Sequence, residues 1–392
     1  MIKNRFVVAF LFFGIFAAAQ DLTVTKIAIF GNETTRPEVI LATFLEVSAG
    51  DTLPQERLEA AASLARDRLV GLRYFSSVLV TVVVSQSTPG TASNVVEFEE
   101  GFLGRFGGGP VWGMAGVDNI GGRGQDATLW LGLNKQAAAW TNQAPGWKGG
   151  TWNAEAGNDP VDWTDSAGEV HENHAVGSTV QMTQALGWGW AFSGSQTTRW
   201  ELSGDYGSGD LRTDQGVRVI WNTTPPGFSP DRGSIAQIEI SGLLPQNLVR
   251  QQADFRTYGS LGWGFKVALH AAVGTQQGTF TDRDALNLAG FDGLRKPFDS
   301  TDLSRTRIWT STELRWSSLD MPLLGFCTVT VEPALIADAG QGWSDGSSGS
   351  AWDAGVALRV FFGAPVEVPL RIETTLDNRG RRWSGFGVEA PY

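Results

Sequence analysis

This sequence of 392 residues has few cysteines and histidines and no excess of basic residues. The single Cys327 excludes an intrachain disulfide and a cysteine-based metal cluster. Three histidines, His171, His174 and His270, leave little for a histidine metal site. The net charge of -11 argues against nucleic acid as a partner, because phosphate binding needs a basic surface. We therefore expect no cofactor, no metal and no nucleic acid.

Long apolar runs are also missing beyond the N-terminus. No later stretch approaches the roughly 20 apolar residues that a transmembrane helix needs. The mean hydropathy of -0.10 is ordinary for a soluble protein. It is equally compatible with a membrane β-barrel, because only every second residue of a barrel strand meets lipid.

The first residues have the features of a secretory signal. Lys3 and Arg5 supply a positive start, and Phe6 to Phe16 form an apolar segment too short to span a bilayer. Ala17 to Ala19 then fit the small-residue cleavage pattern. We predict a signal peptide at residues 1–19, with an uncleaved N-terminal anchor as the alternative.

Residues 20–100 have the pattern of a small α+β domain in the order β-α-α-β-β. The expected strands are Thr23 to Phe30, Ser77 to Ser85 and Ser93 to Glu99. Pro37 and Pro54 suit the starts of two helices. The second helix has one apolar face at helical spacing, made by Leu58, Ala61, Ala62, Ala65 and Leu69.

Residues 101–392 alternate apolar and polar residues in segments of about ten, which is typical of an antiparallel barrel in a membrane. Clear runs are Asp126 to Leu133, Leu186 to Ser193, Leu261 to Val273 and Trp352 to Phe362. We predict a transmembrane barrel of about sixteen strands, with twelve to fourteen also open. A soluble sandwich or propeller would alternate too, but the apolar faces here are rich in tryptophan, which favours membrane interfaces.

The small domain resembles a polypeptide-transport-associated (POTRA) domain. Ile27 to Asn32, Ala49 to Asp51 and Leu72 to Val78 carry the resemblance. It implies a periplasmic module that adds an unfolded chain to an exposed sheet edge. A small domain that only shields the barrel mouth is the alternative.

Four segments of the barrel resemble the outer-membrane insertase and two-partner-secretion transporter superfamily. Asn119 to Gly124 looks like the turn after the family's first barrel strand, with Asn119, Gly121 and Gly124 as its motif residues. Ala334 to Gly340 looks like a late strand that ends in Asp-x-Gly. The final strands are matched by Ala354 to Arg359 and Pro369 to Glu373.

The fourth segment, Gly290 to Arg295, resembles the start of the family's long inward loop, expected here at residues 280–300. Gly290 and Gly293 would allow the chain to fold back. The resemblance implies that Arg295 reaches acidic residues on the strand walls, and the alternation makes Glu313 and Asp338 its expected partners. This would be a structural lock, since a guanidinium taken out of water needs a paired carboxylate. A solvated Arg295 in an extracellular loop is the alternative.

The sequence departs from the family next to this arginine. The family has a glycine and an aromatic residue where Lys296 and Pro297 stand, with Phe298 one place late. The conformation of the loop tip is therefore the open point of the resemblance.

No catalytic constellation is expected. The pair His171 and His174 is expected in a loop, without a metal. Gly342 to Gly346 spells the nucleophile-elbow pattern, but no helix pattern follows, so a barrel loop is expected there.

The resemblance implies a bacterial outer-membrane protein with its N-terminal domain in the periplasm, which inserts or secretes unfolded polypeptides. Its partners would be client chains, outer-membrane lipid and other assembly-machinery subunits. The C-terminal strand, with Phe386, Val388 and Tyr392 on one face, would be the assembly signal, and a seam would join Pro110–Asp118 to Ser384–Tyr392. A passive channel with an N-terminal plug domain is the alternative function.

Overall fold

The computed structural model describes residues 21–101, 103–109, 112–132, 136–143, 148–165, 167, 169–203, 211–225, 229–279, 281–289, 293–299, 302–316, 319–323, 327–344, 347–362 and 369–388. The predicted signal peptide at 1–19 lies outside these residues, as do Gly290 and Tyr392.

The N-terminal domain is a four-stranded sheet covered by two helices. In chain order its elements are β1 (Asp21–Phe30), α1 (Pro37–Leu41), β2 (Thr52–Pro54), α2 (Gln55–Leu72), β3 (Phe75–Val84) and β4 (Thr91–Glu100). The sheet order is β2-β1-β4-β3, with β1 parallel to β4 and the other pairs antiparallel. The predicted order β-α-α-β-β is confirmed, and the short β2 is an addition to it.

The core of this domain lies between α2 and the sheet. The predicted apolar face of α2 is fully inside it: Leu58, Ala61, Ala65 and Leu69 have no exposed surface. Burial of such side chains is the main stabilising contribution to a small domain. Among the described helices, none is long and apolar enough to cross a membrane.

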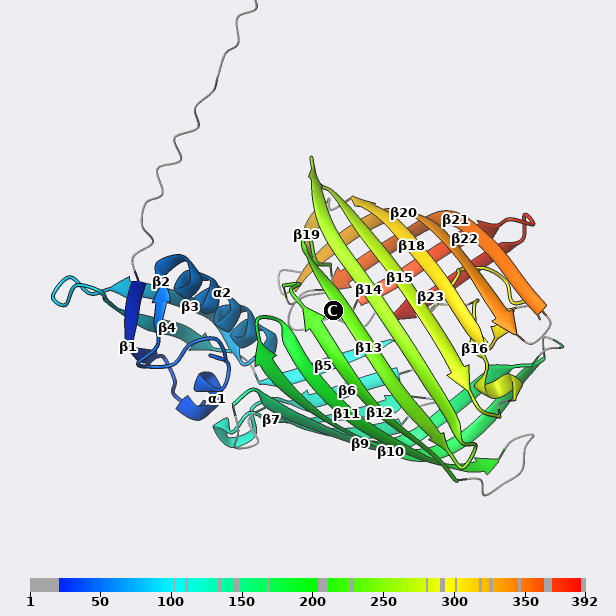
Figure 1. The fold of residues 1–392 in the computed structure, drawn as a ribbon, viewed down its shortest axis with the longest axis horizontal. Helices are drawn as coiled ribbons and strands as arrows, with labels where there is room; N and C mark the ends of the chain where they lie inside the picture. Colours follow the sequence, from blue (N-terminus) through cyan, green and yellow to red (C-terminus); the bar gives the residue numbers. More distant parts are fainter. Residues whose placement is uncertain are drawn as a thin grey trace, which may run out of the picture.

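Most of the described strands after Glu100 form a closed antiparallel barrel (Figure 1). Its strands in chain order are β5 (Gly104–Gly109), β6 (Trp112–Val117), β7 (Gln125–Gly132), β8 (Gln136–Asn142), β9 (Gly150–Thr164), β10 (Val170–Gly187), β11 (Trp190–Ser203), β12 (Leu211–Asn222), β13 (Gly233–Leu244), β14 (Leu248–Gly262), β15 (Phe265–Gln277), β18 (Thr306–Trp316), β19 (Leu319–Leu323), β20 (Cys327–Ser344), β21 (Ser347–Phe362), β22 (Pro369–Asp377) and β23 (Arg382–Val388). Because β18 and β19 follow one another opposite β20, they occupy one position. The described strands thus fill sixteen positions, as predicted.

The two faces of the barrel differ in chemistry. Large apolar side chains are exposed on the outside, among them Leu131, Phe192, Val217, Ile238, Leu335, Val356, Ile372 and Phe386. Charged side chains are buried on the inside, among them Glu201, Glu313, Glu332, Asp338, Arg359 and Glu373. The alternation therefore predicted the faces of these strands correctly.

Two of the predicted runs are not single strands. Gly187-Trp188-Gly189 is the hairpin between β10 and β11, and Gly262-Trp263-Gly264 is the hairpin between β14 and β15. All six residues have positive φ, including 50° at Trp188 and 53° at Trp263. The outward residues keep the same parity on both sides of each hairpin, so the alternation passes through the turn without a break.

Three further expectations need correction. The first described barrel strand is β5, and the described part of Pro110–Asp118 contains the second strand, β6, so it is not at the seam. The turn at Asn119 to Gly124 consequently follows the second strand. Asp338 and Gly340 lie in the middle of β20, which continues to Ser344.

Candidate functional site

A long loop between β15 and β18 folds back against the inner wall of the barrel. It contains a short 3-10 helix, η2 (Asp282–Asp284), and a two-stranded ribbon of β16 (Leu286–Asn287) and β17 (Leu303–Ser304). Beyond the ribbon, Leu288 and Leu294 are fully buried against Trp309 of β18. Trp309 lies on the inner face of β18 and provides the apolar surface against which the loop packs.

Two glycines make this close approach possible. A Cβ on Gly293 would lie 2.4 Å from the carbonyl oxygen of Leu288, closer than real Cβ atoms come. On the facing strand, a Cβ on Gly340 would lie 2.9 Å from Leu288 Cδ1. The pattern Asp-x-Gly in β20 therefore combines a carboxylate and an open space for a loop side chain.

Arg295 of the loop reaches three acidic residues of the barrel wall. Its Nη1 donates to both carboxylate oxygens of Asp338 at 2.7 and 2.8 Å, and its Nη2 donates to Glu313 Oε1 at 2.8 Å. Its Nε lies 3.1 Å from Glu373 Oε2. Ser311 Oγ accepts a further bond at 3.1 Å. The structure thus brings together the three residues predicted to meet, Arg295, Glu313 and Asp338.

Glu373 was missed by the sequence prediction. It belongs to a second layer of ion pairs in which Arg371 donates from Nη2 to Glu313 and from Nε to Glu373, both at 2.7 Å. Arg315 Nε also donates to Glu313, at 2.9 Å. Alternation along β22 already places Arg371 and Glu373 on one face, so the signal was present in the sequence.

The unusual loop tip is accommodated by an ion pair of its own. Lys296, which stands in place of the family's glycine, is 3% exposed and pairs with Asp302 of the same loop. Asp302 also accepts a hydrogen bond from the backbone N–H of Asp299 at 2.7 Å. A buried ammonium needs such a partner, and Asp302 provides it without disturbing Arg295.

The turn after β6 joins the barrel to the N-terminal domain. Asn119 donates from Nδ2 to Thr35 Oγ1 at 2.7 Å and accepts the N–H of Gly124 at 2.9 Å. Asp126 Oδ1 accepts both the Asn119 N–H, at 2.8 Å, and the hydroxyl of Tyr74, at 2.9 Å. The predicted motif residues Asn119 and Gly124 therefore shape a docking turn.

A second junction lies at the β10–β11 hairpin. Glu46 of the N-terminal domain pairs with Arg68 and accepts the backbone N–H of Trp188 at 2.6 Å. Burial by itself raises the pKa of Glu46, but the hydrogen bond and charge of Arg68, with the bond from Trp188, hold this pKa below its usual value.

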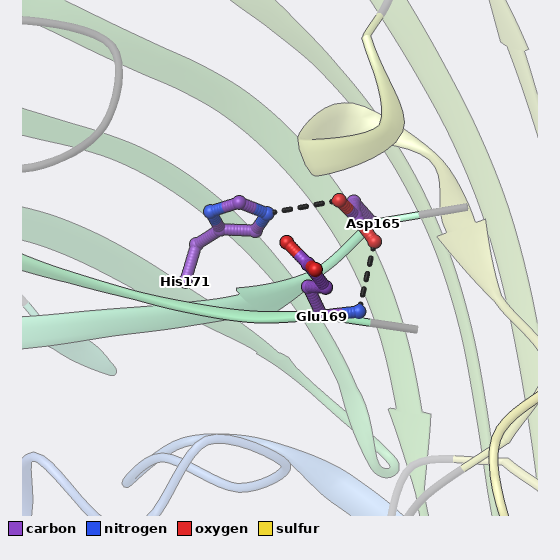
Figure 2. A group of neighbouring side chains, drawn as sticks. All are labelled: Asp165, Glu169 and His171. Atoms are coloured by element: carbon purple, nitrogen blue, oxygen red, sulfur yellow. Dashed lines mark hydrogen bonds and ion pairs between the residues drawn. The ribbon is translucent and has the colours of Figure 1, made fainter. Parts of the chain in front are cut away.

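Asp165, Glu169 and His171 gather where β9 and β10 meet (Figure 2). Asp165 Oδ1 accepts the backbone N–H groups of Ala167 and Glu169 at 2.9 Å, and Oδ2 lies 3.1 Å from His171 Nε2. The hydrogen bond from His171 and these backbone bonds lower the pKa of Asp165. These hydrogen bonds explain why the three side chains lie close together without a metal ion. His171 and His174 lie in β10 and not in the predicted loop.

The first and last strands are neighbours in the barrel. The sheet order places β23 next to β5, which closes the ring. Phe386 of β23 is exposed on the outer face, and Val388 is the last residue of this strand. The predicted assembly signal thus lies at the seam as far as Val388.

Comparisons with known proteins agree with both parts of this structure. Residues 22–101 match the family model described as "POTRA: Surface antigen variable number repeat". This part of the chain is therefore similar to a POTRA domain, and we call it the POTRA domain. No curated protein matches the sequence.

Solved structures extend the likeness to the barrel. CdiB from Escherichia coli aligns with a TM-score of 0.64 at 12% identity, covering 95% of this chain and 77% of its own. CdiB from Acinetobacter baumannii gives 0.57 at 12% identity, with 95% and 74% covered. BamA from Haemophilus ducreyi, lacking POTRA domains 1-3, gives 0.54 at 14% identity, with 94% and 83% covered. The chain therefore has the POTRA-and-barrel fold that these proteins share.

The POTRA domain has a long open sheet edge at β3. Among the described strands, β3 pairs only with β4. Leu79 and Val83 of β3 are exposed, at 54% and 48%. An edge with unpaired backbone groups and apolar side chains is suited to pair with another extended chain.

Proposed function

We propose that this protein captures unfolded polypeptide in the periplasm and inserts it into, or secretes it through, the bacterial outer membrane. The observation that carries the proposal is the combination of a docked POTRA domain with an open edge and a barrel that closes between its first and last strands. The free edge of β3 offers backbone hydrogen-bonding groups to an extended chain, and the seam would offer them when β5 and β23, which are paired in this structure, separate.

The membrane location rests on the outer surface of the barrel. Its exposed apolar side chains would cost free energy in water, at about 25 cal/mol for each Å² left exposed. A closed barrel is one of only two structures that satisfy every backbone group inside a bilayer. With this membrane location we propose the following division of the chain: a signal peptide at 1–19, a periplasmic domain at 20–100, and a barrel at 101–392 with its inward loop at 280–300.

Arg295, Glu313 and Asp338 would act as a structural lock in this scheme, without catalysis. The loop contacts the part of the barrel wall that contains β18, β20 and β22, which are among the last strands before β23. A lock there would fix the shape of the strands that lead to the seam. No enzymatic step is proposed.

A passive channel with an N-terminal plug is the second candidate. A cavity of about 790 Å³ remains inside the barrel beside the loop, and its lining includes the charged or titratable side chains of Asp254, Arg256, His270 and Arg307. A continuous path through this cavity would conduct ions.

Reconstitution separates the two functions. The full chain in proteoliposomes is offered a urea-unfolded outer-membrane barrel protein, and the protease-protected fraction of that client is measured. The proposal predicts protection well above that of empty liposomes. Protection at the level of empty liposomes, together with a steady ion conductance that survives deletion of residues 21–99, would instead establish the channel.

A further inference from the structure

The outer surface of β11 and β12 carries a polar patch inside the apolar belt. Along β11 the outward residues run from Trp190 through Gln196 and Thr198 to Trp200. On β12, Gln215 lies directly opposite Gln196, and Thr213 lies opposite Thr198. Both glutamines are exposed, and both threonines are half-buried.

The two tryptophans place this patch at membrane depth. Tryptophan is enriched at both membrane–water interfaces. The stretch from Trp190 to Trp200 matches the roughly 9–11 residues that a tilted strand needs to cross the hydrocarbon core. Gln196 and Thr198 lie between these two markers, and lipid alone would offer them no hydrogen-bond partner.

The patch satisfies itself only in part. Gln215 Nε2 donates to Gln196 Oε1 at 3.1 Å, Gln196 Nε2 donates to Thr198 Oγ1 at 3.5 Å, and the hydroxyls of Thr198 and Thr213 lie 3.5 Å apart. Each amide has two N–H donors and an oxygen that accepts two bonds, so these contacts leave both donors and acceptors available. Leaving an amide without a partner in an apolar medium is unfavourable, so the remaining groups favour a polar partner.

Two glycines beside the patch leave the outer surface there without protruding side chains. Gly194 precedes Gln196 on the outer face of β11, and Gly242 of β13 lies opposite Gln215. A Cβ at either glycine would meet no atom within 4 Å, so the surface is open outward at both. Ser178 of β10 lies opposite Thr198 and adds one more hydroxyl. Another barrel wall could therefore approach closely.

We propose that this face, defined by Gln196, Thr198, Thr213 and Gln215, is the contact site for a second copy of this chain in the membrane. A two-fold axis through the patch would set amide against amide, and because a primary amide both donates and accepts, each copy would complete the other. A charged headgroup fits less well, since the four side chains carry no charge. The inference rests on the proposed membrane location.

The position in the ring is compatible with the proposed activity. β10, β11 and β12 are the sixth to eighth strand positions, counted from β5, so they lie across the barrel from the seam of β5 and β23. A dimer built on this face leaves both seams free.

Cysteine cross-linking in native membranes tests the contact. In a Cys327→Ser background, Gln196→Cys is compared with Ile372→Cys, which places the thiol on the outer face of β22. Because a two-fold contact brings a residue near its own copy, a short bis-maleimide should link Gln196→Cys into a species of twice the chain mass. Ile372→Cys should remain monomeric. Equal linking at both positions, or a link from Gln196→Cys to a different polypeptide, overturns the proposal.

Mass photometry in nanodiscs provides the second measurement. The native protein should be dimeric at low lipid ratio, and Gln196→Leu with Gln215→Leu should make it monomeric while the barrel keeps its unfolding temperature. If the double variant fails to fold, the native protein alone decides, because a monomer at every lipid ratio contradicts the inference. A monomer that still inserts clients overturns the dimer only, whereas a dimer that inserts none overturns the proposed function only.

Discussion

At the residue scale, Arg295 is the shared cation of the ion pairs inside the barrel. Its guanidinium is 9% exposed and contacts Glu313, Asp338 and Glu373 on three different strands. The sequence predicted the first two partners because a family motif and the alternation agreed. Alternation placed Glu373 on the same face of β22 as Arg371, but it could not show that Glu373 meets Arg295, because that contact depends on how the strands are arranged around the barrel.

Removal of this arginine should destabilise the barrel. Arg295→Ala leaves three carboxylates without their shared cation, and breaking a buried ion pair costs about 3–5 kcal/mol. The unfolding temperature, followed by gel mobility of the heated barrel, should fall clearly. Exchange of charges by Arg295→Glu with Glu313→Arg should not restore it, because Arg315 and Arg371 also contact Glu313.

Arg379→Ala is the matched control. Arg379, in the turn between β22 and β23, pairs with Asp299 of the inward loop that carries Arg295. The side chain of Arg379 is 59% exposed. Exposed pairs contribute about 0–1 kcal/mol, so the unfolding temperature should hardly change. An equal effect of Arg295→Ala and Arg379→Ala would contradict the lock.

Glu46 makes the domain junction sensitive to acid. Its lowered pKa means that the folded state favours the charged form, so its contribution is complete above the usual value of 4.5 and is lost as pH falls through the lowered pKa. Energy transfer between dyes on the POTRA domain and the β10–β11 hairpin should decrease in that acid range. Glu46→Gln should flatten the profile there; an unchanged profile would rule out this residue.

At the element scale, the hairpins and turns decided what the sequence could show. Alternation predicted which face each strand residue lies on. It did not reveal the hairpins at Trp188 and Trp263, because the alternating pattern continues through both turns. The turn at Asn119 to Gly124 stood out for its glycines. Its role as a docking surface needed the other partner, the segment at Thr34 and Thr35, which no local pattern connects to it.

Two neighbouring glycines of this turn allow a clean test. Gly121 and Gly122 both have positive φ, at 60° and 70°, so alanine is strained at either, by roughly 1–2 kcal/mol. Only at Gly122 would the new Cβ meet another residue, 1.9 Å from the Thr34 carbonyl oxygen; at Gly121 it meets nothing within 4 Å. Gly122→Ala should therefore loosen the POTRA domain, seen as faster proteolysis at the junction near Gly101. Similar proteolysis of both variants would exclude docking through this turn.

At the scale of the whole molecule, the POTRA domain and the barrel form one connected structure. The domain contacts the turns that follow β6 and β10, at one end of the barrel (Figure 1). A client paired with the free edge of β3 would thus be held close to the barrel mouth. The α+β class of the N-terminal domain and the β class of the barrel were predictable, because the 3.6-residue spacing of a helix and the 2-residue spacing of a strand can be read from a single sequence. The seam was not, since the glycine-rich β5 has no alternation to reveal it.

A cysteine pair across β5 and β23, in the Cys327→Ser background, tests the central claim most directly. With the seam oxidised, the protease-protected fraction of client in proteoliposomes should fall to the level of empty liposomes, and reduction should restore it. Client protection that is unchanged by the closed seam would contradict the proposed route between the first and last strands.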